Sequence, residues 1–447
     1  MLCLAYDNRR NRDRRPVDRD DYTGGVLRPP PHGCRLDGMI REIHFAIPVL
    51  LLIASSGACS PDGKPPADET FLDRPPLENG ILVAQAVLDK DAEGKPLPQP
   101  AQLGILTFDQ GGWHYRTIED ADSNVFHKAM AYAGHSDSGG ILTFGGTRAI
   151  VKLWSPGRQP EVLWEADFGG RFSRMRDAEV ADIFGDGSSA IAVATHDQGV
   201  VAVVRPNEEG LFDAQELDRQ TGTFVQENEI GDLDGDSLLE IYATPSAPNK
   251  LDGTPQPGKV VRYVPAAGEG RTVVADLDDR HAKEILVEDF DDDGFDELYV
   301  SVEAVSGGNV EIRRFDRDTD PAAGVVIAEL QDTLCRFLTA GDIDGDGRKE
   351  MVAATYKSGL WLLRRGEPRW SSELIDPDSS GFEHAAVFAD LDEDGVDELY
   401  VASDKHDEIR RYLWRDGKPL REVIHRHTDG LSRFTWNLMP APVRMIP

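Results

Sequence analysis

A nine-residue acidic turn recurs five times in this chain, and it constrains the fold more than any other feature. Each copy lies between short apolar runs, rich in β-branched and aromatic residues, that alternate with a period of two. The first aspartates of successive copies lie 48 to 57 residues apart, which indicates a repeated structural unit. The copies read DIFGDGSSA from Asp182, DLDGDSLLE from Asp232, DFDDDGFDE from Asp289, DIDGDGRKE from Asp342 and DLDEDGVDE from Asp390.

The flanks of the turns repeat as well. IYAT, LYVS, MVAA and LYVA follow the four later turns, and the next strand-like runs, KVVRYV, NVEIRRF, GLWLLRR and EIRRYLW, are rich in arginine. A unit of three or four such strands cannot bury both of its faces alone. Stacking the units radially into a ring buries the faces and protects the strand edges. The repeat therefore predicts an all-β fold, a β-propeller over residues 78–447.

The two ends of the repeat region predict how the ring closes. Residues 113–154 have the rhythm of a unit without its acidic turn, and the C-terminal REVIHRHTDGLSRFTWNL supplies only the first part of a unit. Near the other end, GILVAQAVL and QLGILTF look like the missing later strands. Joining the N- and C-terminal strands in one shared blade gives seven blades, although six or eight remain compatible with the pattern.

The turns have the composition of a calcium site. Ca²⁺ takes about six to eight oxygen ligands, and aspartates at positions one, three and five can supply three carboxylates. Glycine at position six permits the positive φ that such a turn requires, and an acid at position nine closes the ligand shell. An EF-hand would place its closing glutamate at position twelve, where the four later turns have alanine or valine. The turns are therefore not EF-hands.

Over roughly residues 113–435 the pattern resembles the FG-GAP (VCBS-type) repeats of integrin α-chain propellers and many bacterial surface proteins. The resemblance implies about four structural Ca²⁺ ions. Carried over by position, the ligands are Asp232, Asp234, Asp236 and Glu240; Asp289, Asp291, Asp293 and Glu297; Asp342, Asp344, Asp346 and Glu350; and Asp390, Asp392, Asp394 and Glu398. Ser237 stands where glycine is expected and weakens the first set. The Asp182 turn has Phe184 and Ala190 at ligand positions, so we expect it to have lost its ion.

A second set of polar residues is predicted at one mouth of the central channel, where each innermost strand begins. These residues are Arg176, Gln226, Lys283, Arg336 and His384, with His127 and Arg433 at corresponding positions. A basic ring on an acidic protein could capture an anionic ligand. The same residues could instead pair with neighbouring acids. An insertion at residues 245–259 lengthens one loop, as on a recognition face.

The start of the chain predicts export. Residues 1–38 are rich in Arg, Pro and Asp, which is typical of a disordered leader or of an untranslated upstream stretch. Residues 39–58 have a charged start, an apolar run and small residues at the end, which is the layout of a secretory signal. The apolar part is shorter than the ~20 residues needed to span a bilayer.

The end of the signal, SGAC, resembles the lipobox of bacterial lipoproteins, with Ser56 where leucine is commonest. The resemblance implies a lipid on Cys59, and an ordinary cleaved signal is the alternative. Ser60 follows the cysteine, where aspartate would favour the inner membrane, so the outer membrane is favoured. Residues 59–77 are rich in proline and predict a tether between membrane and propeller.

The formal net charge of −32 excludes a nucleic-acid partner, because phosphates would be repelled. No sequence motif of a nucleophilic hydrolase, zinc protease or nucleotide-binding loop is present. We therefore expect an exported, lipid-anchored, calcium-stabilised propeller that binds or scaffolds an envelope protein or glycan. The alternative is a polysaccharide lyase-like enzyme that acts on an acidic glycan at the channel mouth.

Overall fold

The computed structural model describes residues 76–134, 139–169, 173–366 and 369–447. These residues belong to one compact unit, which holds all the strands described below. The predicted leader, the signal segment, Cys59 and all but the end of the tether lie outside the described residues. Among the residues that are described, no helix is long and apolar enough to cross a membrane.

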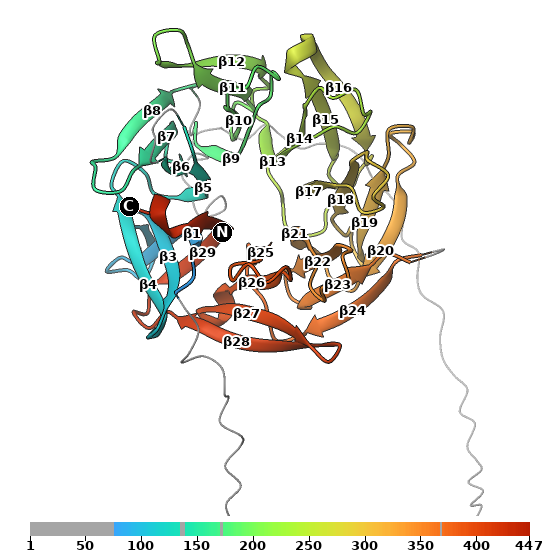
Figure 1. The fold of residues 1–447 in the computed structure, drawn as a ribbon. Helices are drawn as coiled ribbons and strands as arrows, with labels where there is room; N and C mark the ends of the chain where they lie inside the picture. The colour runs from blue at the N-terminus through green and yellow to red at the C-terminus, as the bar shows by residue number, and fades with distance from the viewer. Residues whose placement is uncertain (1–75, 135–138, 170–172, 367–368) are drawn as a thin grey trace, which may run out of the picture. The chain divides into compact units, whose positions relative to one another are not determined.

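The chain forms an all-β ring of seven blades, which confirms the predicted fold (Figure 1). Six blades are four-stranded antiparallel sheets whose strands pair in chain order. They are β5–β8 (Phe126–Tyr132, Gly140–Gly145, Ala149–Trp154, Glu161–Ala166), β9–β12 (Met175–Ala181, Ala190–Thr195, Val201–Pro206, Phe212–Asp218), β13–β16 (Phe224–Gly231, Glu240–Ser246, Lys259–Val264, Glu269–Asp276), β17–β20 (Ala282–Glu288, Glu297–Val302, Val310–Phe315, Val325–Leu330), β21–β24 (Cys335–Gly341, Glu350–Thr355, Leu360–Arg364, Ser371–Asp376) and β25–β28 (Ala386–Ala389, Glu398–Ser403, Glu408–Arg415, Lys418–Arg426).

The seventh blade is shared by the two ends of the chain, as predicted. Strand β29 (Ser432–Pro442) pairs antiparallel with β1 (Asn79–Lys90), and β3 (Ala101–Asp109) and β4 (Gly112–Asp120) complete the sheet. A short strand, β2 (Pro96–Pro98), pairs with the end of β1.

Two details of the predicted blade boundaries were wrong. Trp113 begins the outer strand of the shared blade, so the next blade starts at β5 rather than at Trp113. Similarly, the REVIHR segment is the outer strand β28 of the preceding blade, and only β29 enters the shared one. Outer strands are largely exposed, so their polar residues do not show the repeat that the buried strands show.

The blades bury their faces against one another. The first strands of neighbouring blades pack together around the centre, while β8, β12, β16, β20, β24, β28 and β4 form the rim (Figure 1). One apolar cluster joins Leu142 of one blade to Val193 and Val204 of the next, and similar clusters link the other blades. This contact between blades supplies the burial that a single repeat lacks.

The strand order gives the ring two faces. In an antiparallel sheet, successive connections lie at opposite ends of the strands. All five acidic turns join the first and second strands of a blade, so they lie on one face, here called the turn face. The connections between second and third strands lie on the opposite face, here called the loop face. The insertion at 245–259 joins β14 to β15 and belongs to the loop face.

Candidate metal turns and the channel mouth

The first aspartate of each acidic turn organises the backbone. The Asp232 carboxylate accepts hydrogen bonds from the backbone N–H groups of Gly235 at 2.8 Å and Ser237 at 2.9 Å. The Asp342 carboxylate accepts the same pair of bonds from Gly345 at 2.7 Å and Gly347 at 2.8 Å. An aspartate at this position therefore holds the turn closed through its own side chain, as in other Asx turns.

Positions four and six of every acidic turn have positive φ. Position six is glycine in four turns, but in the first predicted site Ser237 takes this conformation with φ of 68°. Asp292 and Glu393 do so at position four, with φ of 56° and 57°. A left-handed conformation costs a residue with a side chain about 1–2 kcal/mol, so Ser237 adds strain to its turn.

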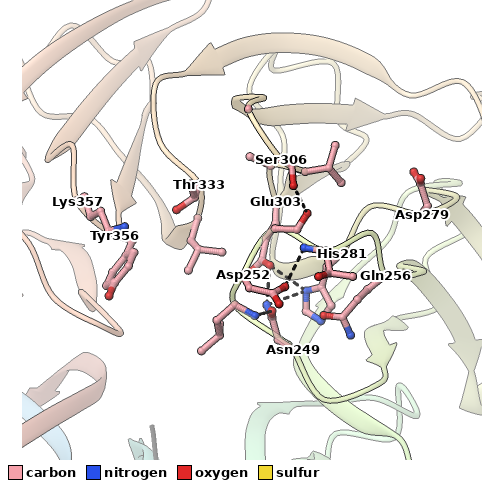
Figure 2. Close-up of a pocket in the computed structure, with 17 residues that line it drawn as sticks. Asn249, Asp252, Gln256, Asp279, His281, Glu303, Ser306, Thr333, Tyr356 and Lys357 are labelled. Atoms are coloured by element: carbon pink, nitrogen blue, oxygen red, sulfur yellow. Dashed lines mark hydrogen bonds and ion pairs between the residues drawn. The ribbon is translucent and has the colours of Figure 1, made fainter. Parts of the chain in front are cut away.

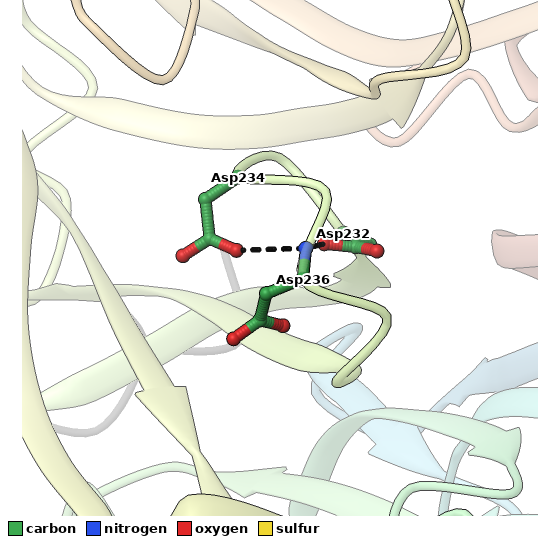
Figure 3. Close-up of side chains that lie close together, drawn as sticks. All are labelled: Asp232, Asp234 and Asp236. Atoms are coloured by element: carbon green, nitrogen blue, oxygen red, sulfur yellow. Dashed lines mark hydrogen bonds between the residues drawn. The ribbon is translucent and has the colours of Figure 1, made fainter.

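The carboxylates of four turns converge. In each of these turns three ligand atoms lie within 4.8 Å of one another. The groups are Asp232, Asp234 and Asp236 (Figure 3); Asp289, Asp291 and Asp293; Asp342, Asp344 and Glu350; and Asp390, Asp392 and Asp394. In the second group, Oδ1 of Asp291 is buried and has no hydrogen-bond partner. Clustered carboxylate oxygens of this kind fit a hard cation such as Ca²⁺.

Four predicted ligands lie outside these groups: Glu240, Glu297, Asp346 and Glu398. Each of the three glutamates is the first residue of the second strand of its blade. Oε2 of Glu240 accepts hydrogen bonds from the backbone N–H of Leu233 at 3.0 Å and from the hydroxyl of Tyr242. The hydroxyl groups of Tyr299 and Tyr400 donate in the same way to Glu297 and Glu398, both at 2.9 Å. The closing glutamate therefore fastens its turn to the second strand.

An arginine from the third strand faces the carboxylates of its own blade. Arg262 on β15 contacts Asp234 at 3.0 Å and also contacts Glu240. Arg364 on β23 lies 3.4 Å from Asp344 and 3.6 Å from Glu350. The sequence showed that these strands contain arginines but did not reveal their role. The guanidinium groups offset part of the negative charge that the turns concentrate.

The Asp182 turn keeps the backbone bonds but has lost two of the four acids, because Phe184 and Ala190 stand at positions three and nine. Its Asp182 carboxylate accepts the N–H groups of Asp186 and Gly187, as in the other turns. Phe184 occupies the third position, and the guanidinium of Arg205 lies 4.0 Å from its ring centroid. An aromatic ring therefore stands where the other turns place their third-position carboxylate, and the third-strand arginine packs on that ring and lies 3.3 Å from Asp186.

Three residues of the predicted channel ring converge on one carboxylate. Glu383 lies 2.9 Å from Arg336, 3.2 Å from Lys283 and 3.7 Å from Arg176. All four side chains are almost fully buried. Burial would raise the pKa of Glu383, but the three cations outweigh it and hold the pKa below its usual value. The cations expected to receive an anionic ligand thus already hold an internal anion.

The other predicted ring positions have separate partners. The ring nitrogens of His384 bond Ser379 Oγ and the Thr355 carbonyl oxygen, both at 2.7 Å. Strand β25 begins only at Ala386, so His384 lies before the strand, with φ of 50°. Burial lowers the pKa of His384 to about 4, so it is neutral at physiological pH.

The remaining positions are also buried. Gln226 is buried on β13, and His127 on β5 packs against the ring of Trp436 at 4.5 Å between centroids. Arg433 on β29 donates to Asp429 at 2.8 Å. The sequence placed these residues on the innermost strands, but it could not show which neighbours satisfy them.

One known protein family matches a part of the chain that holds two of the acidic turns. The FG-GAP-like repeat family matches residues 342–401, which hold the Asp342 and Asp390 turns. The protein is a β-propeller that contains an FG-GAP-like repeat. FG-GAP repeats typically bind calcium, and this propeller carries several acidic clusters at the corresponding turns.

One solved structure shares the fold at a TM-score of 0.50. The Dos1 propeller is 9% identical, with a TM-score of 0.50, and the match covers 79% of this FG-GAP repeat propeller and 87% of that chain. A Bacteroides fragilis protein with the provisional name 6-phosphogluconolactonase is 12% identical with a TM-score of 0.46, covering 84% and 100% of the two chains. No curated protein matches the chain. At these identities the likeness to Dos1 concerns the fold alone.

Proposed function

We propose that this FG-GAP repeat propeller is a calcium-stabilised binding module, exported and held at the cell envelope by a lipid on Cys59. The observation that carries the proposal is the convergence of carboxylates at the same turn of four consecutive blades. Bound Ca²⁺ would offset the negative charge that the neighbouring arginines leave uncompensated. The aspartates at positions one, three and five would hold it, with Glu350 in the third turn.

The expected free energies suit a structural role for the ions. Extracellular calcium modules bind with dissociation constants of about 10⁻⁴–10⁻³ M. At roughly 1 mM calcium and a constant of ~0.1 mM, each site adds about 1.4 kcal/mol to the free energy of unfolding. Four sites would add about 5–6 kcal/mol, which is comparable to the whole net stability of a domain.

The test of the calcium proposal is a thermal melt of the purified protein with calcium and with excess chelator, with bound metal counted on the same sample. We expect a rise of many degrees with calcium and about four ions per chain, each site adding the ~1.4 kcal/mol estimated above. Magnesium serves as a control, because it dehydrates reluctantly and prefers a rigid octahedral site. An unchanged melt without bound metal would refute the proposal.

The membrane anchor has its own test. Metabolic labelling with a fatty-acid analogue should label the wild-type protein but not Cys59→Ser, and only the wild type should sediment with membranes. Several acyl chains, at ~0.8 kcal/mol per buried CH₂, would hold the protein firmly. Equal labelling of both forms would show that Cys59 is not the lipidated residue.

The partner of the binding module would be an envelope protein or glycan, and the outer membrane is the proposed location.

Binding is favoured over cleavage of an acidic glycan. A lyase-like site at the channel mouth would need free cations to neutralise the substrate's uronate. Instead, Arg176, Lys283 and Arg336 surround Glu383 and are buried.

A further inference from the structure

A cavity of about 290 Å³ opens on the loop face, beside the channel mouth. We propose that it binds a sugar without acidic groups, either neutral or amino-bearing, of one or two rings. The inference rests on the proposal that the protein is a binding module, and it names the ligand class. The cavity is lined by the 245–259 insertion and by loops of the two following blades (Figure 2).

The floor of the cavity is a buried polar network. Asn249 Nδ2 donates to Glu303 Oε2 at 2.6 Å and lies 3.4 Å from His281 Nδ1. His281 Nε2 lies 3.1 Å from Ser246 Oγ, and Glu303 Oε1 lies 3.7 Å from Arg336. Glu303 and His281 are each about 5% exposed. Burial lowers the pKa of His281, so the floor presents a neutral imidazole beside a carboxylate.

The insertion is fixed in place by its own hydrogen bonds. The Gln256 side chain accepts the Lys250 backbone N–H at 2.7 Å and donates to the Pro248 carbonyl at 3.0 Å. The backbone N–H of Ser306, in the next blade, donates to the Gly253 carbonyl at 3.1 Å. The loop therefore forms a preformed wall, which lowers the ordering cost of binding.

The lining suits a sugar in its chemistry. Tyr356 and Lys357 lie across the cavity from Asn249 (Figure 2). Tyr356 is half-buried, and Lys357 Nζ lies 4.8 Å from its ring centroid, so the part of the ring that Lys357 leaves uncovered is the aromatic surface for the apolar face of a sugar ring. Asp252 and Asp279 are exposed at the cavity, and their oxygens accept the hydrogen bonds that hydroxyl or ammonium groups donate.

The charges exclude an acidic sugar. The lining carries the carboxylates of Asp252, Asp279 and Glu303 but only one lysine, Lys357, while His281 is neutral. Buried Arg336 faces Glu303, so the two exposed aspartates carry the excess of negative charge. A uronate in the cavity would be repelled by this excess of negative charge. A neutral sugar meets no such penalty, and an amino sugar gains attraction.

The experiment is a calorimetric titration of the purified protein with four sugars. The set is cellobiose, the disaccharide of N-acetylglucosamine, glucosamine and glucuronate. We expect saturable binding of at least one of the first three and none of glucuronate. Asp252→Asn should weaken glucosamine binding, and Tyr356→Ala should weaken binding of any sugar, by roughly tenfold each, which corresponds to about 1.4 kcal/mol.

The controls separate binding from folding. Asn at position 252 can still accept the 2.9 Å bond from the Thr254 N–H, so Asp252→Asn keeps the loop. Asp416→Asn, in the exposed β27–β28 turn, should leave binding unchanged. A melt of each variant reports folding. Absence of binding up to the solubility of each sugar, or a preference for glucuronate, would overturn the inference. Neither result bears on the effect of calcium on the melting temperature. A failure of the sugar inference is therefore distinguishable from a failure of the calcium proposal.

Discussion

The Asp296 carboxylate accepts a hydrogen bond from the backbone N–H of Asp232 at 2.8 Å, across two neighbouring blades. The Asp296 N–H donates in return to the Asp232 carbonyl at 3.4 Å. Asp397 and Asp342 form the same reciprocal pair, with both distances at 2.9 Å. Position eight of one acidic turn thus holds position one of the preceding turn, and the four turns are joined in two pairs.

We predict that Asp296→Ala lowers calcium affinity at the neighbouring Asp232 turn. The backbone N–H of Asp232 loses its acceptor, and an unsatisfied buried group costs about 1–3 kcal/mol. A calcium titration and a melt in chelator measure the two effects. Asp296→Asn retains a carbonyl oxygen and should behave more like the wild type. Identical titrations for Asp296→Ala and wild type would show that the turns bind independently.

A matched pair of variants tests which turns hold ions. Asp394 and Asp186 both occupy position five, and each accepts a backbone hydrogen bond at 3.0 Å from the residue two positions later. Asparagine preserves that bond but removes the charge. Asp394→Asn should therefore lose much of one site's contribution, about 1.4 kcal/mol of calcium-dependent stability. Asp186→Asn should lose none of it. An equal loss in both would mean that the Asp182 turn also binds an ion.

Ser237→Gly should stabilise the metal-free protein by up to about 1.6 kcal/mol. Removing the left-handed strain gains about 1–2 kcal/mol, while the freer unfolded chain offsets about 0.4–1 kcal/mol. Denaturant unfolding in chelator measures the difference. Ser188→Gly is the control, because Ser188 is not among the residues with positive φ and should gain nothing. A loss of stability for Ser237→Gly would show that the serine side chain supports the turn.

We predict that the buried carboxyl group of Glu227 on β13 makes the free energy of unfolding fall as pH rises. Burial, together with Asp177 and Glu284, raises its pKa well above the ordinary 4.5, and Lys283 offsets this only in part. Between the unfolded and folded pKa values the native state holds more protons, so the free energy of unfolding declines with increasing pH. Glu227→Gln should therefore raise the melting temperature at about pH 8 but not at about pH 4. A gain of equal size at both values would contradict a charge effect.

Much of the fold followed from the spacing of the acidic turns. Their period predicted the blades, and the incomplete units at either end predicted the pairing of β29 with β1. The outer strands were harder to place, because β4 and β28 face solvent and need no fixed apolar pattern. The convergence of the aspartates also followed from local sequence, since they lie within five residues of one another.

The channel mouth could not be derived in the same way. Glu383 lies just before β25, outside any repeated motif, yet it meets Arg176, Lys283 and Arg336 from three different blades. Such a contact depends on how the blades converge around the axis, which no local pattern encodes. The role of Arg262 was missed for a related reason, because its partner Glu240 lies on a neighbouring strand. The role of Tyr242 could have been found, because Glu-x-Tyr recurs after three of the acidic turns.

The pairing of β29 with β1 has a consequence for when the protein can fold. β29 is the last strand of the ring to be synthesised, and β1 is the first, so the ring stays open until nearly the whole chain has left the ribosome. An open series of blades lacks its final contacts, so it is easier to unfold than the closed ring. Under the export proposed above, closure by β29 would complete folding once the chain has crossed the membrane.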